Sequence, residues 1–478
     1  MPSFLDSIWL HERKTALIEP DGNKVSYSAL FQEVDNLRSK FRKTKDIAIL
    51  ICKNTKLSIA GYLAFVTSEV VPILLGPKLP ITSLNNYINI YRPRYLYLDF
   101  FLDHESYFRM ESKDGYHLYV SKEDSEVENI HPSLRLLLTT SGSTGSPKLV
   151  RVSDRNLRIN SEMICSSLPM KDNDIAITTL PFNYSYGLSI LNTHLLKGLS
   201  IQLNEHSVIQ RDFWKLLYES KSTTFGGVPF LYQQINQIGA GKLLSSSVSY
   251  LTQAGGKLAG ASLDNIYQTC AEGKIEFYVM YGQTEATARM SVLTPAEASK
   301  HPGSIGKAIT PGSFALSPYE AEYITPGRLV GELVFHGENV ALGYAQNLAD
   351  LELGDEWNGT LKTGDLAYFD EEGFPYIVGR INRFGKIRGV RFSFDDLENM
   401  FQKLGVNVVV LEIKEKLFLL ANQDIEITLL DRALKDNAGL RLKDFVFKKI
   451  EEIPRTQSGK VDYLSISNEL AIVEELYK

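Results

Sequence analysis

The sequence predicts an α/β fold built on parallel sheets that helices cover on both faces. From about residue 46 to residue 280, continuous apolar runs rich in β-branched residues alternate with helix-like stretches. Such runs are typical of strands buried on both faces, and their alternation with helices is typical of parallel sheets. The chain has 478 residues, of which 44% are hydrophobic and 23% are charged. This length and composition suit a folded protein of more than one domain and exclude disordered and fibrous classes.

The alternation is clearest at the start of this region. Residues 46–52 predict a buried strand, residues 55–69 predict a helix, and residues 70–75 predict the next strand. The pattern continues in four later runs, at 174–180, 199–204, 248–256 and 275–282. Ligands of such sheets bind beyond the carboxyl ends of the strands, so the residues that follow these runs are candidates for a binding site.

The sequence pattern changes at about residue 303. Over 303–380, short apolar runs are broken by glycine, proline and acidic turns, which predicts a small antiparallel, β-barrel-like subdomain. Hairpin-like strands, a helix near 395–404 and a strand at 406–413 come after it. We therefore expect an N-terminal domain over 1–380 and a smaller α+β C-terminal domain over 381–478.

Charge and cysteine content exclude several function classes. The chain has 51 basic and 57 acidic side chains, a formal net charge of −6, which does not suit a general nucleic-acid binder. Cys52, Cys165 and Cys270 form no CxxC and the eight histidines form no HExxH, so neither a disulfide framework nor a zinc site is predicted. We find neither a signal-peptide segment nor an apolar run of membrane-spanning length, and we expect a cytoplasmic protein without a membrane span.

A loop of small and hydroxylated residues carries the strongest chemical signal. It runs from Thr139 to Lys148 between two apolar stretches that predict strands. Small residues let the backbone approach a polyphosphate, N–H groups and hydroxyls donate to its oxygens, and Lys148 adds a positive charge. The spacing GSTGSPK, followed by a strand, differs from the Walker A pattern, which precedes a helix. The alternative is an exposed Ser/Gly hairpin, and the loop alone indicates only phosphate binding.

Four further segments sharpen this interpretation. They are Met280–Glu285, Lys362–Asp365, Gly379–Arg391 and Pro454–Asp462. Together with the loop, and in this order, they resemble the motifs of the adenylate-forming superfamily: acyl- and aryl-CoA synthetases, adenylation domains of nonribosomal peptide synthetases, and beetle luciferases. The resemblance covers nearly the whole chain, and five motifs in order are far more specific than any one of them. It implies a large N-terminal domain followed by a small mobile lid.

The resemblance also implies ATP and Mg²⁺ as cofactors and assigns residues to the nucleotide. The loop residues that would hold its β- and γ-phosphates are Thr140, Ser141, Gly142, Ser143, Thr144, Gly145 and Lys148. Tyr281 would stack on adenine, with Gly282 beside it and Gly255 and Gly256 next to the ring. Asp365 would accept hydrogen bonds from the ribose hydroxyls, assisted by Arg380.

The catalytic assignments come from the same resemblance. Thr284 would touch the α-phosphate, and Glu285 would bind Mg²⁺ together with Thr144, because this ion prefers hard oxygen ligands. Lys460 would bridge the substrate carboxylate and the α-phosphate, where a cation is needed because two anions approach each other. Lys386 would face the site during the second half-reaction. Taken singly, each residue has a structural alternative, such as a core tyrosine, a surface carboxylate or a turn residue.

Two positions depart from the family pattern. Asn382 stands at the hinge, where the family has Asp; rotation about a peptide needs no charge, so we expect the hinge to work. Gly385 replaces an aliphatic residue before Lys386, which predicts a more flexible loop there.

The segment 180–190 matches the floor of the family's acid pocket. Tyr184 stands where many CoA ligases have His, and Ser185 stands where amino-acid-activating domains have an Asp that pairs with the substrate ammonium. An unpaired ammonium is costly in a desolvated pocket, so an aliphatic, hydroxy or aryl acid is favoured over an α-amino acid. Other residues expected to line this pocket, with core packing as the alternative, are Phe225, Gly226 and Met290.

The sequence thus predicts an enzyme that forms acyl-AMP and then transfers the acyl group to a thiol. The acceptor is either coenzyme A or the phosphopantetheine of a carrier protein acting in trans, and the sequence does not decide between them. Alternatives within enzymes are a stand-alone adenylation enzyme for an amino acid and a ligase that acylates amines. An alternative from another class is a non-catalytic nucleotide-binding relative.

Overall fold

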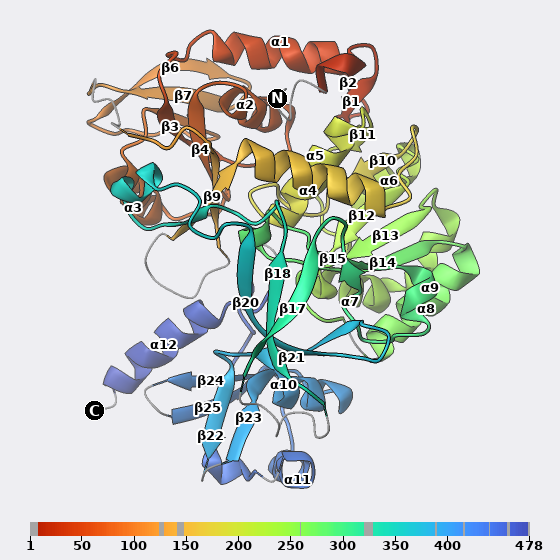
Figure 1. Ribbon diagram of the computed structural model, residues 1–478. Helices are drawn as coiled ribbons and strands as arrows, with labels where there is room; N and C mark the ends of the chain where they lie inside the picture. Colours follow the sequence, from red (N-terminus) through yellow and green to blue (C-terminus); the bar gives the residue numbers. More distant parts are fainter. Residues whose placement is uncertain are drawn as a thin grey trace.

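The computed structural model describes residues 8–123, 129–140, 148–258, 260–319, 328–387, 390–413, 416–438, 440–456 and 459–476. Two large sheets fill the upper part of the molecule in Figure 1, and the C-terminal elements lie below them. Within the described ranges, one of these sheets has nine strands and the other has eight.

Strand order in both sheets departs from chain order, as crossovers require. Across the larger sheet of the described residues run β16 (Lys307–Ala308), β15 (Ser291–Leu293), β14 (Glu276–Tyr281), β13 (Tyr250–Gln253), β12 (Thr224–Gly227), β10 (Ile175–Ile177), β11 (Ser200–Gln202), β1 (Thr15–Ile18) and β2 (Lys24–Ser26). Across the other run β19 (Gly343–Ala345), β9 (Leu149–Ser153), β8 (Leu134–Thr139), β4 (Val70–Leu75), β3 (Asp46–Ile51), β5 (Tyr95–Leu98), β7 (Tyr116–Ser121) and β6 (Tyr107–Lys113).

Both sheets are parallel in the middle and antiparallel at their edges. Strand β3 pairs in parallel with β4 and β5, and β13 pairs in parallel with β12 and β14. The edge pairs β8–β9, β6–β7, β14–β15 and β1–β2 are antiparallel. Every residue of β3 and β4 is buried, as expected for strands covered on both faces. The predicted α/β class is confirmed, with hairpins added at the sheet edges.

Helices cover the faces of the sheets and separate one sheet from the other. Those of the N-terminal region are α1 (Tyr27–Arg38), α2 (Lys56–Val66), α3 (Ile81–Tyr91), α4 (Asp154–Ser167), α5 (Ser185–Leu196), α6 (Arg211–Glu219), α7 (Pro229–Ile238), α8 (Ala261–Gly273) and α9 (Pro295–Ala298). Thr55 caps the start of helix α2 by accepting the Ser58 N–H with its hydroxyl, and nearly all side chains of the helix are buried. One core cluster joins side chains of α1, α2 and α5 with side chains of both sheets, so α2 is buried between them.

The region predicted as a barrel-like subdomain is an open sheet. Its strands, in order across the sheet, are β17 (Ser313–Pro318), β18 (Gly331–His336), β20 (Thr360–Phe369) and β21 (Pro375–Arg380). All neighbours among these described strands are antiparallel, as predicted. Strand β19 lies in the same stretch of sequence but pairs with β9 of the eight-stranded sheet, which ties the two parts together.

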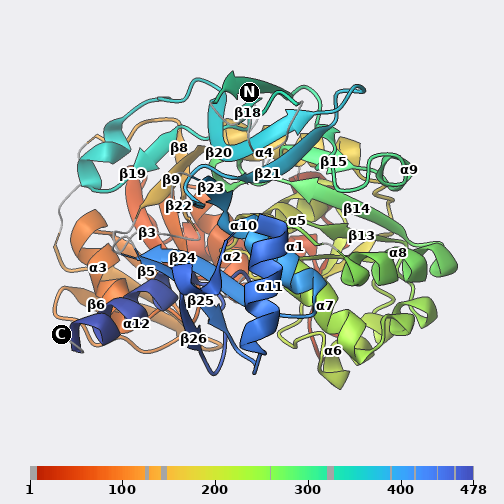
Figure 2. The ribbon, with the colours of Figure 1, turned by 90° about the horizontal axis from the view of Figure 1, so that it is seen from below.

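The C-terminal elements build cores of their own. They are β22 (Phe384–Ile387), β23 (Val390–Ser393), α10 (Phe394–Lys403), β24 (Val408–Ile413), β25 (Lys416–Ala421), α11 (Ile427–Ala438), β26 (Val446–Lys449) and α12 (Tyr463–Leu476). Their core clusters, among the residues described, draw side chains only from this part of the chain. Seen from below, these elements lie in front of the junction between the two large sheets (Figure 2). A small C-terminal domain thus packs on a large N-terminal one. None of the helices in the described ranges combines the length and apolar character that a membrane span requires.

Candidate active site

The carboxyl ends of three neighbouring parallel strands form one side of the candidate site. Strands β12, β13 and β14 pair in register, so their last residues lie side by side. Gly255 follows β13 with a φ of +86°, and a Cβ there would lie 2.6 Å from the Tyr184 hydroxyl oxygen. Glycine is needed at this position because the left-handed conformation and the close contact both exclude a side chain. The short 3₁₀ helix η3 (Thr284–Ala286) follows β14 and holds the next candidate residues.

Asp365 is the centre of a hydrogen-bond network at this edge. Its side chain is buried in β20, directly across the strand pair from Arg380 in β21. The Arg380 Nε donates to Oδ1 at 2.9 Å, and Oδ2 accepts from the Tyr281 hydroxyl and, at 3.0 Å, from the Gln283 side-chain amide. The carboxylate of Asp365 raises the pKa of Arg380. Three donors therefore hold this carboxylate beside Tyr281, where the sequence predicted nucleotide binding.

Glu285 and Lys148 meet through a tyrosine that sequence reasoning missed. The Tyr344 hydroxyl of β19 donates to Glu285 Oε1 at 2.8 Å. The Lys148 Nζ lies 3.4 Å from the centroid of the Tyr344 ring, a cation–π contact. Tyr344 thus connects the lysine of the predicted phosphate loop with the predicted Mg²⁺ ligand. It comes from a short strand with no motif around it, so no local pattern pointed to it.

The remaining parts of the predicted phosphate loop are only partly described. Thr140 and Lys148 bracket the loop, and Ser141, Gly142, Ser143, Thr144 and Gly145 lie outside the described residues. Lys386 lies in strand β22, opposite Arg391 of β23, and its side chain is likewise outside the described part. The roles predicted for these residues stay predictions.

Lys460 brings the C-terminal domain into the site. Its Nζ lies 5.5 Å from the centroid of the Tyr184 ring, and its Cε would be 3.6 Å from a Cβ on Gly255. Burial, with a smaller contribution from the Arg380 charge, lowers the pKa of Lys460 to about 8, against the opposing effects of Glu285 and Asp365. Lys460 therefore lies beside Tyr184 and Gly255, and its charge interacts with Glu285 and Asp365, four residues of the predicted site.

The predicted hinge lies between two anchored arginines. Arg380 is held by Asp365 of the N-terminal domain, as described above. Arg383 is held within the C-terminal domain by Asp395 at 2.5 Å and Glu398 at 2.7 Å, and its guanidinium lies 4.0 Å from the centroid of the Tyr463 ring. Asn382, between them, is exposed.

The predicted acid-pocket residues lie around the start of α5. Ser185, the first residue of α5, has its hydroxyl oxygen 3.1 Å from that of Thr284, so the predicted floor contacts the loop after β14. A Cβ on Gly226 would come 2.7 Å from the Tyr186 hydroxyl oxygen. Phe225 and Met290 are fully buried members of the same hydrophobic core cluster.

A buried arginine near this floor was also missed. Arg289 is 2% exposed, and its guanidinium lies 4.0 Å from the centroid of the Tyr186 ring. The available signal was a single cation inside the otherwise uncharged stretch 286–295.

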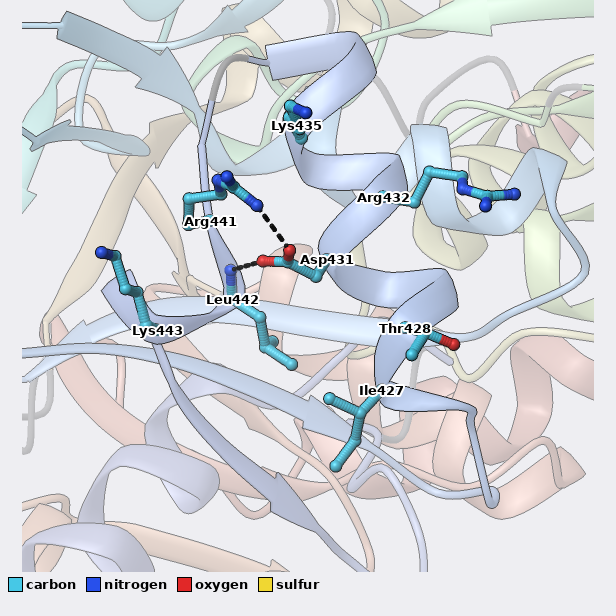
Figure 3. A pocket seen from close by; sticks show the side chains of 8 residues that line it. All are labelled: Ile427, Thr428, Asp431, Arg432, Lys435, Arg441, Leu442 and Lys443. Carbon is cyan, nitrogen blue, oxygen red and sulfur yellow. Dashed lines mark hydrogen bonds and ion pairs between the residues drawn. The ribbon is translucent and has the colours of Figure 1, made fainter.

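A separate pocket of about 670 Å³ lies on the C-terminal domain, between α11 and the 3₁₀ helix η5 (Leu442–Asp444) (Figure 3). Its lining residues are Ile427, Thr428, Asp431, Arg432, Lys435, Arg441, Leu442 and Lys443. The one carboxylate in this lining, Asp431, accepts from Arg441 at 2.9 Å and from the Leu442 N–H at 2.8 Å. Cations outnumber it, so this pocket is basic in an acidic chain.

Sequence and structure comparisons point to one family. The sequence profile described as AMP-binding enzyme matches residues 8–345. The chain is 25% identical over 415 residues to the 2-succinylbenzoate–CoA ligase of Oceanobacillus iheyensis, covering 83% of each chain. Its fold matches the O-succinylbenzoate coenzyme A synthetase MenE of Bacillus subtilis in complex with ATP and magnesium (TM-score 0.75, 21% identity, 98% and 99% coverage). It also matches ATP-bound MatB of Rhodopseudomonas palustris (TM-score 0.78, 18% identity, 99% of each chain). At these identities the two structures support the fold alone.

Proposed function

Because the chain belongs to the AMP-binding enzyme family, we propose that it is an AMP-forming ligase that joins a carboxylic acid to the thiol of coenzyme A. The position of Lys460 carries this proposal. A cation from the C-terminal domain lies against Tyr184 and Gly255, within the electrostatic influence of Glu285 and Asp365. That is the position a residue must occupy if it is to neutralise two anions that react with each other.

The residues present fit a bound adenine nucleotide. Gly255 and Gly256 have no side chains, so the backbone at this edge would let a flat ring approach closely beside Tyr281. Asp365 is a fixed carboxylate acceptor, as ribose hydroxyls require. Lys148 stands at the end of the predicted phosphate loop and supplies positive charge for the phosphates of ATP.

Glu285 would hold Mg²⁺ in this scheme. Its Oε1 is oriented by the Tyr344 hydroxyl, and hard carboxylate oxygen is the donor that Mg²⁺ prefers. No cluster of three or more metal-binding side chains occurs among the described residues, which suits an ion held by one carboxylate, phosphates and water. When bound, Mg²⁺ would neutralise phosphate charge.

Lys460 acts in the first half-reaction. An oxygen of the acid's carboxylate attacks the α-phosphorus of ATP, the bond to the bridging oxygen breaks, and pyrophosphate leaves. The ammonium of Lys460 offsets the repulsion between the carboxylate and the phosphate and the charge that builds on the phosphoryl oxygens. Thr284, held beside Ser185, contributes a hydroxyl at the same phosphate.

The second half-reaction needs a different surface of the C-terminal domain. The thiol sulfur attacks the carbonyl carbon of acyl-AMP, its proton goes to solvent, and AMP leaves with the bonding electron pair. We propose a domain boundary at residues 380–381 and a rotation about Asn382 that withdraws Lys460 and brings Lys386 inward. The anchoring of Arg380 and Arg383 on opposite sides of Asn382 supports this choice of hinge.

The acid is proposed to be an aryl, hydroxy or aliphatic acid without an α-amino group. Ser185 provides no carboxylate to pair with an ammonium, and its contact with Thr284 supports a position near the reacting centre. The named substrate of the curated relatives, 2-succinylbenzoate, is an aryl acid and is the first compound to test.

The decisive experiment measures acid-dependent pyrophosphate release with ATP and Mg²⁺, with hydroxylamine to trap acyl-AMP as a hydroxamate. A panel of aliphatic, hydroxy, benzoic, aryl-keto and amino acids should give hydroxamate with one class of non-amino acid. Lys460→Ala should lose most of this activity while ATP binding, measured by calorimetry, persists. Pyrophosphate release at the wild-type rate by Lys460→Ala would refute the role of Lys460, and ATP binding without hydroxamate from any acid would indicate a non-catalytic relative.

A carrier protein is the second candidate acceptor, favoured by the basic pocket on the C-terminal domain. Arg432, Lys435 and Lys443 border this pocket without a matching number of lining carboxylates (Figure 3). An acidic partner surface would complement them. The double variant Arg432→Glu/Lys435→Glu should then slow acyl transfer to a phosphopantetheinylated carrier and leave transfer to coenzyme A unchanged. Equal rates with the carrier for variant and wild type would exclude this docking site.

A further inference from the structure

Arg289 is a buried cation without a described counter-ion. Its Nη2 donates to the Ser189 hydroxyl at 3.2 Å, its Nη1 contacts the Met280 sulfur, and its guanidinium stacks on the Tyr186 ring. Its Nε is buried without a hydrogen-bond partner. All these side-chain neighbours are neutral, and across the described ranges no carboxylate is paired with it.

Such an arrangement is costly unless a ligand completes it. Burying an unpaired charge carries a large desolvation penalty, which proteins ordinarily offset with a partner of opposite charge. Burial lowers the pKa of Arg289, and the groups that oppose this effect are the hydroxyls of Tyr184, Tyr186 and Tyr250 rather than an acid. The Tyr250 hydroxyl is itself buried without a partner, so a second polar atom near the guanidinium is unsatisfied.

The position of Arg289 connects it to the proposed acid pocket. It lies at the end of the loop that begins with Gly282 and contains Thr284 and Glu285. The Arg289 guanidinium stacks on Tyr186, which follows Ser185 in the sequence. The Tyr186 hydroxyl is one of the atoms that a Cβ on Gly226 would contact. Tyr186 and Tyr184 have ring centroids 6.3 Å apart, and Tyr184 in turn faces Lys460. A line of aromatic side chains therefore runs from Lys460, at the reacting carboxylate, to Arg289.

We propose that Arg289 binds a second carboxylate of the acid substrate, so that the preferred substrate is a dicarboxylic acid. The planar guanidinium matches the two oxygens of a carboxylate, and a charge-assisted pair satisfies the buried Nε. One carboxylate reacts beside Lys460 while the other is held at Arg289. A buried cation here also repels an ammonium, which strengthens the case against α-amino acids. This inference rests on the proposed function, because it concerns the acid that the same site activates.

The test compares acids that differ only in the second carboxylate. The pairs are 2-succinylbenzoate with 4-oxo-4-phenylbutanoate, succinate with butyrate, and glutarate with pentanoate, each assayed by pyrophosphate release and hydroxamate formation. The wild type should prefer the diacid of at least one pair, and Arg289→Gln should reduce that preference about 30-fold or more through an increase in KM. Arg289→Lys should keep part of the preference, because it restores the charge without the planar fork.

Stability measurements separate a binding role from a structural one. The diacid should raise the melting temperature of the wild type more than its monoacid partner does, and this difference should vanish in Arg289→Gln. Without ligand, Arg289→Met should melt no lower than the wild type, because it replaces an unpaired buried charge with an apolar side chain. A melting temperature far below the wild type would mark a structural arginine and overturn the inference.

The two proposals fail in different ways. If monoacids are activated as well as their diacid partners, the ligase function holds and the role of Arg289 is refuted. The same holds if Arg289→Gln keeps the diacid preference of the wild type. If no acid gives a hydroxamate, the proposed ligase function is refuted and this inference with it.

Discussion

The lowered pKa of Lys460 predicts an alkaline loss of adenylation in the free enzyme. Burial and the nearby Arg380 charge bring this pKa to about 8, whereas a solvated lysine titrates near 10.5. A lysine is protonated below its pKa, so the active, charged form is present below pH 8 and is lost above it. At a pKa of about 8, the protonated fraction falls from about 97% at pH 6.5 to about 3% at pH 9.5. We therefore expect kcat/KM to fall about 30-fold over this interval.

The assay is acid-dependent pyrophosphate release at limiting acid and limiting ATP, measured at half-unit steps from pH 6.5 to pH 9.5. Under these conditions kcat/KM reports the titration of the free enzyme. At saturating ATP and acid, the anions beside Lys460 favour its charged form, so the decline in kcat should move to higher pH. The carboxylate of the acid stays ionised throughout the range and contributes no slope.

Lys460→Arg is the matched control, because a guanidinium stays protonated over the whole range. Its activity should be lower than that of the wild type, since the shape of the cation differs, but flat between pH 7.5 and pH 9.5. A decline in Lys460→Arg that matches the wild type would assign the alkaline limb to another group. A wild-type profile that is flat to pH 9.5 would refute the burial of the lysine in the free enzyme.

Three further predictions concern other residues of the site. Gly255→Ala should lower the free energy of unfolding in urea by roughly 1–3 kcal/mol and weaken ATP binding, because φ is +86° and the new Cβ meets Tyr184. The control is Gly241→Ala, which should be nearly neutral because nothing lies within 4 Å of the new Cβ. Glu285→Gln should raise the Mg²⁺ concentration needed for half-maximal rate. Tyr344→Phe should raise it less, because it removes only the 2.8 Å hydrogen bond to Glu285. Equal Mg²⁺ titrations for the wild type and both variants would exclude Glu285 as a ligand. Arg383→Ala should destabilise the C-terminal domain by about 3 kcal/mol in thermal unfolding, because Glu398 stays buried without its cationic partner. Lys449→Ala removes an exposed ion pair and should cost under about 1 kcal/mol. Similar losses for the two variants would contradict the anchoring role of Arg383.

The sequence predicted the centres of the two large sheets well, for a physical reason. Buried parallel strands such as β3 and β4 are continuous apolar runs, so their positions are visible in sequence. The contact of Asp365 with Arg380 was also accessible, since both belong to quoted motifs and face each other across one strand pair. Local patterns of this kind depend on residues close in sequence or on strands that pair directly.

Other parts of the site were not accessible in this way. Tyr344 reaches Glu285 because β19 leaves its neighbours in sequence and pairs with β9, a choice of partner that no local pattern encodes. In the sequence, Arg289 looks like an ordinary surface charge, and only the structure shows that its side chain is buried. Gln283 lay inside a recognised motif, yet its bond to Asp365 depends on a partner 82 residues away. These contacts depend on packing between segments far apart in the sequence, and the spacing of residues within one motif says little about such packing.

The network at Asp365 makes the interdomain joint sensitive to what the site contains. Arg380 is the last residue before the proposed domain boundary and is held by the carboxylate that is proposed to receive the ribose. A carboxylate has about four acceptor positions, and Tyr281, Gln283 and Arg380 already occupy three of them. One position therefore remains for a ribose hydroxyl, and a second hydroxyl at Asp365 would have to displace one of these three donors. If Arg380 is the donor that is displaced, nucleotide binding would also release the arginine beside the proposed hinge, and the smaller domain would turn after the nucleotide binds rather than before.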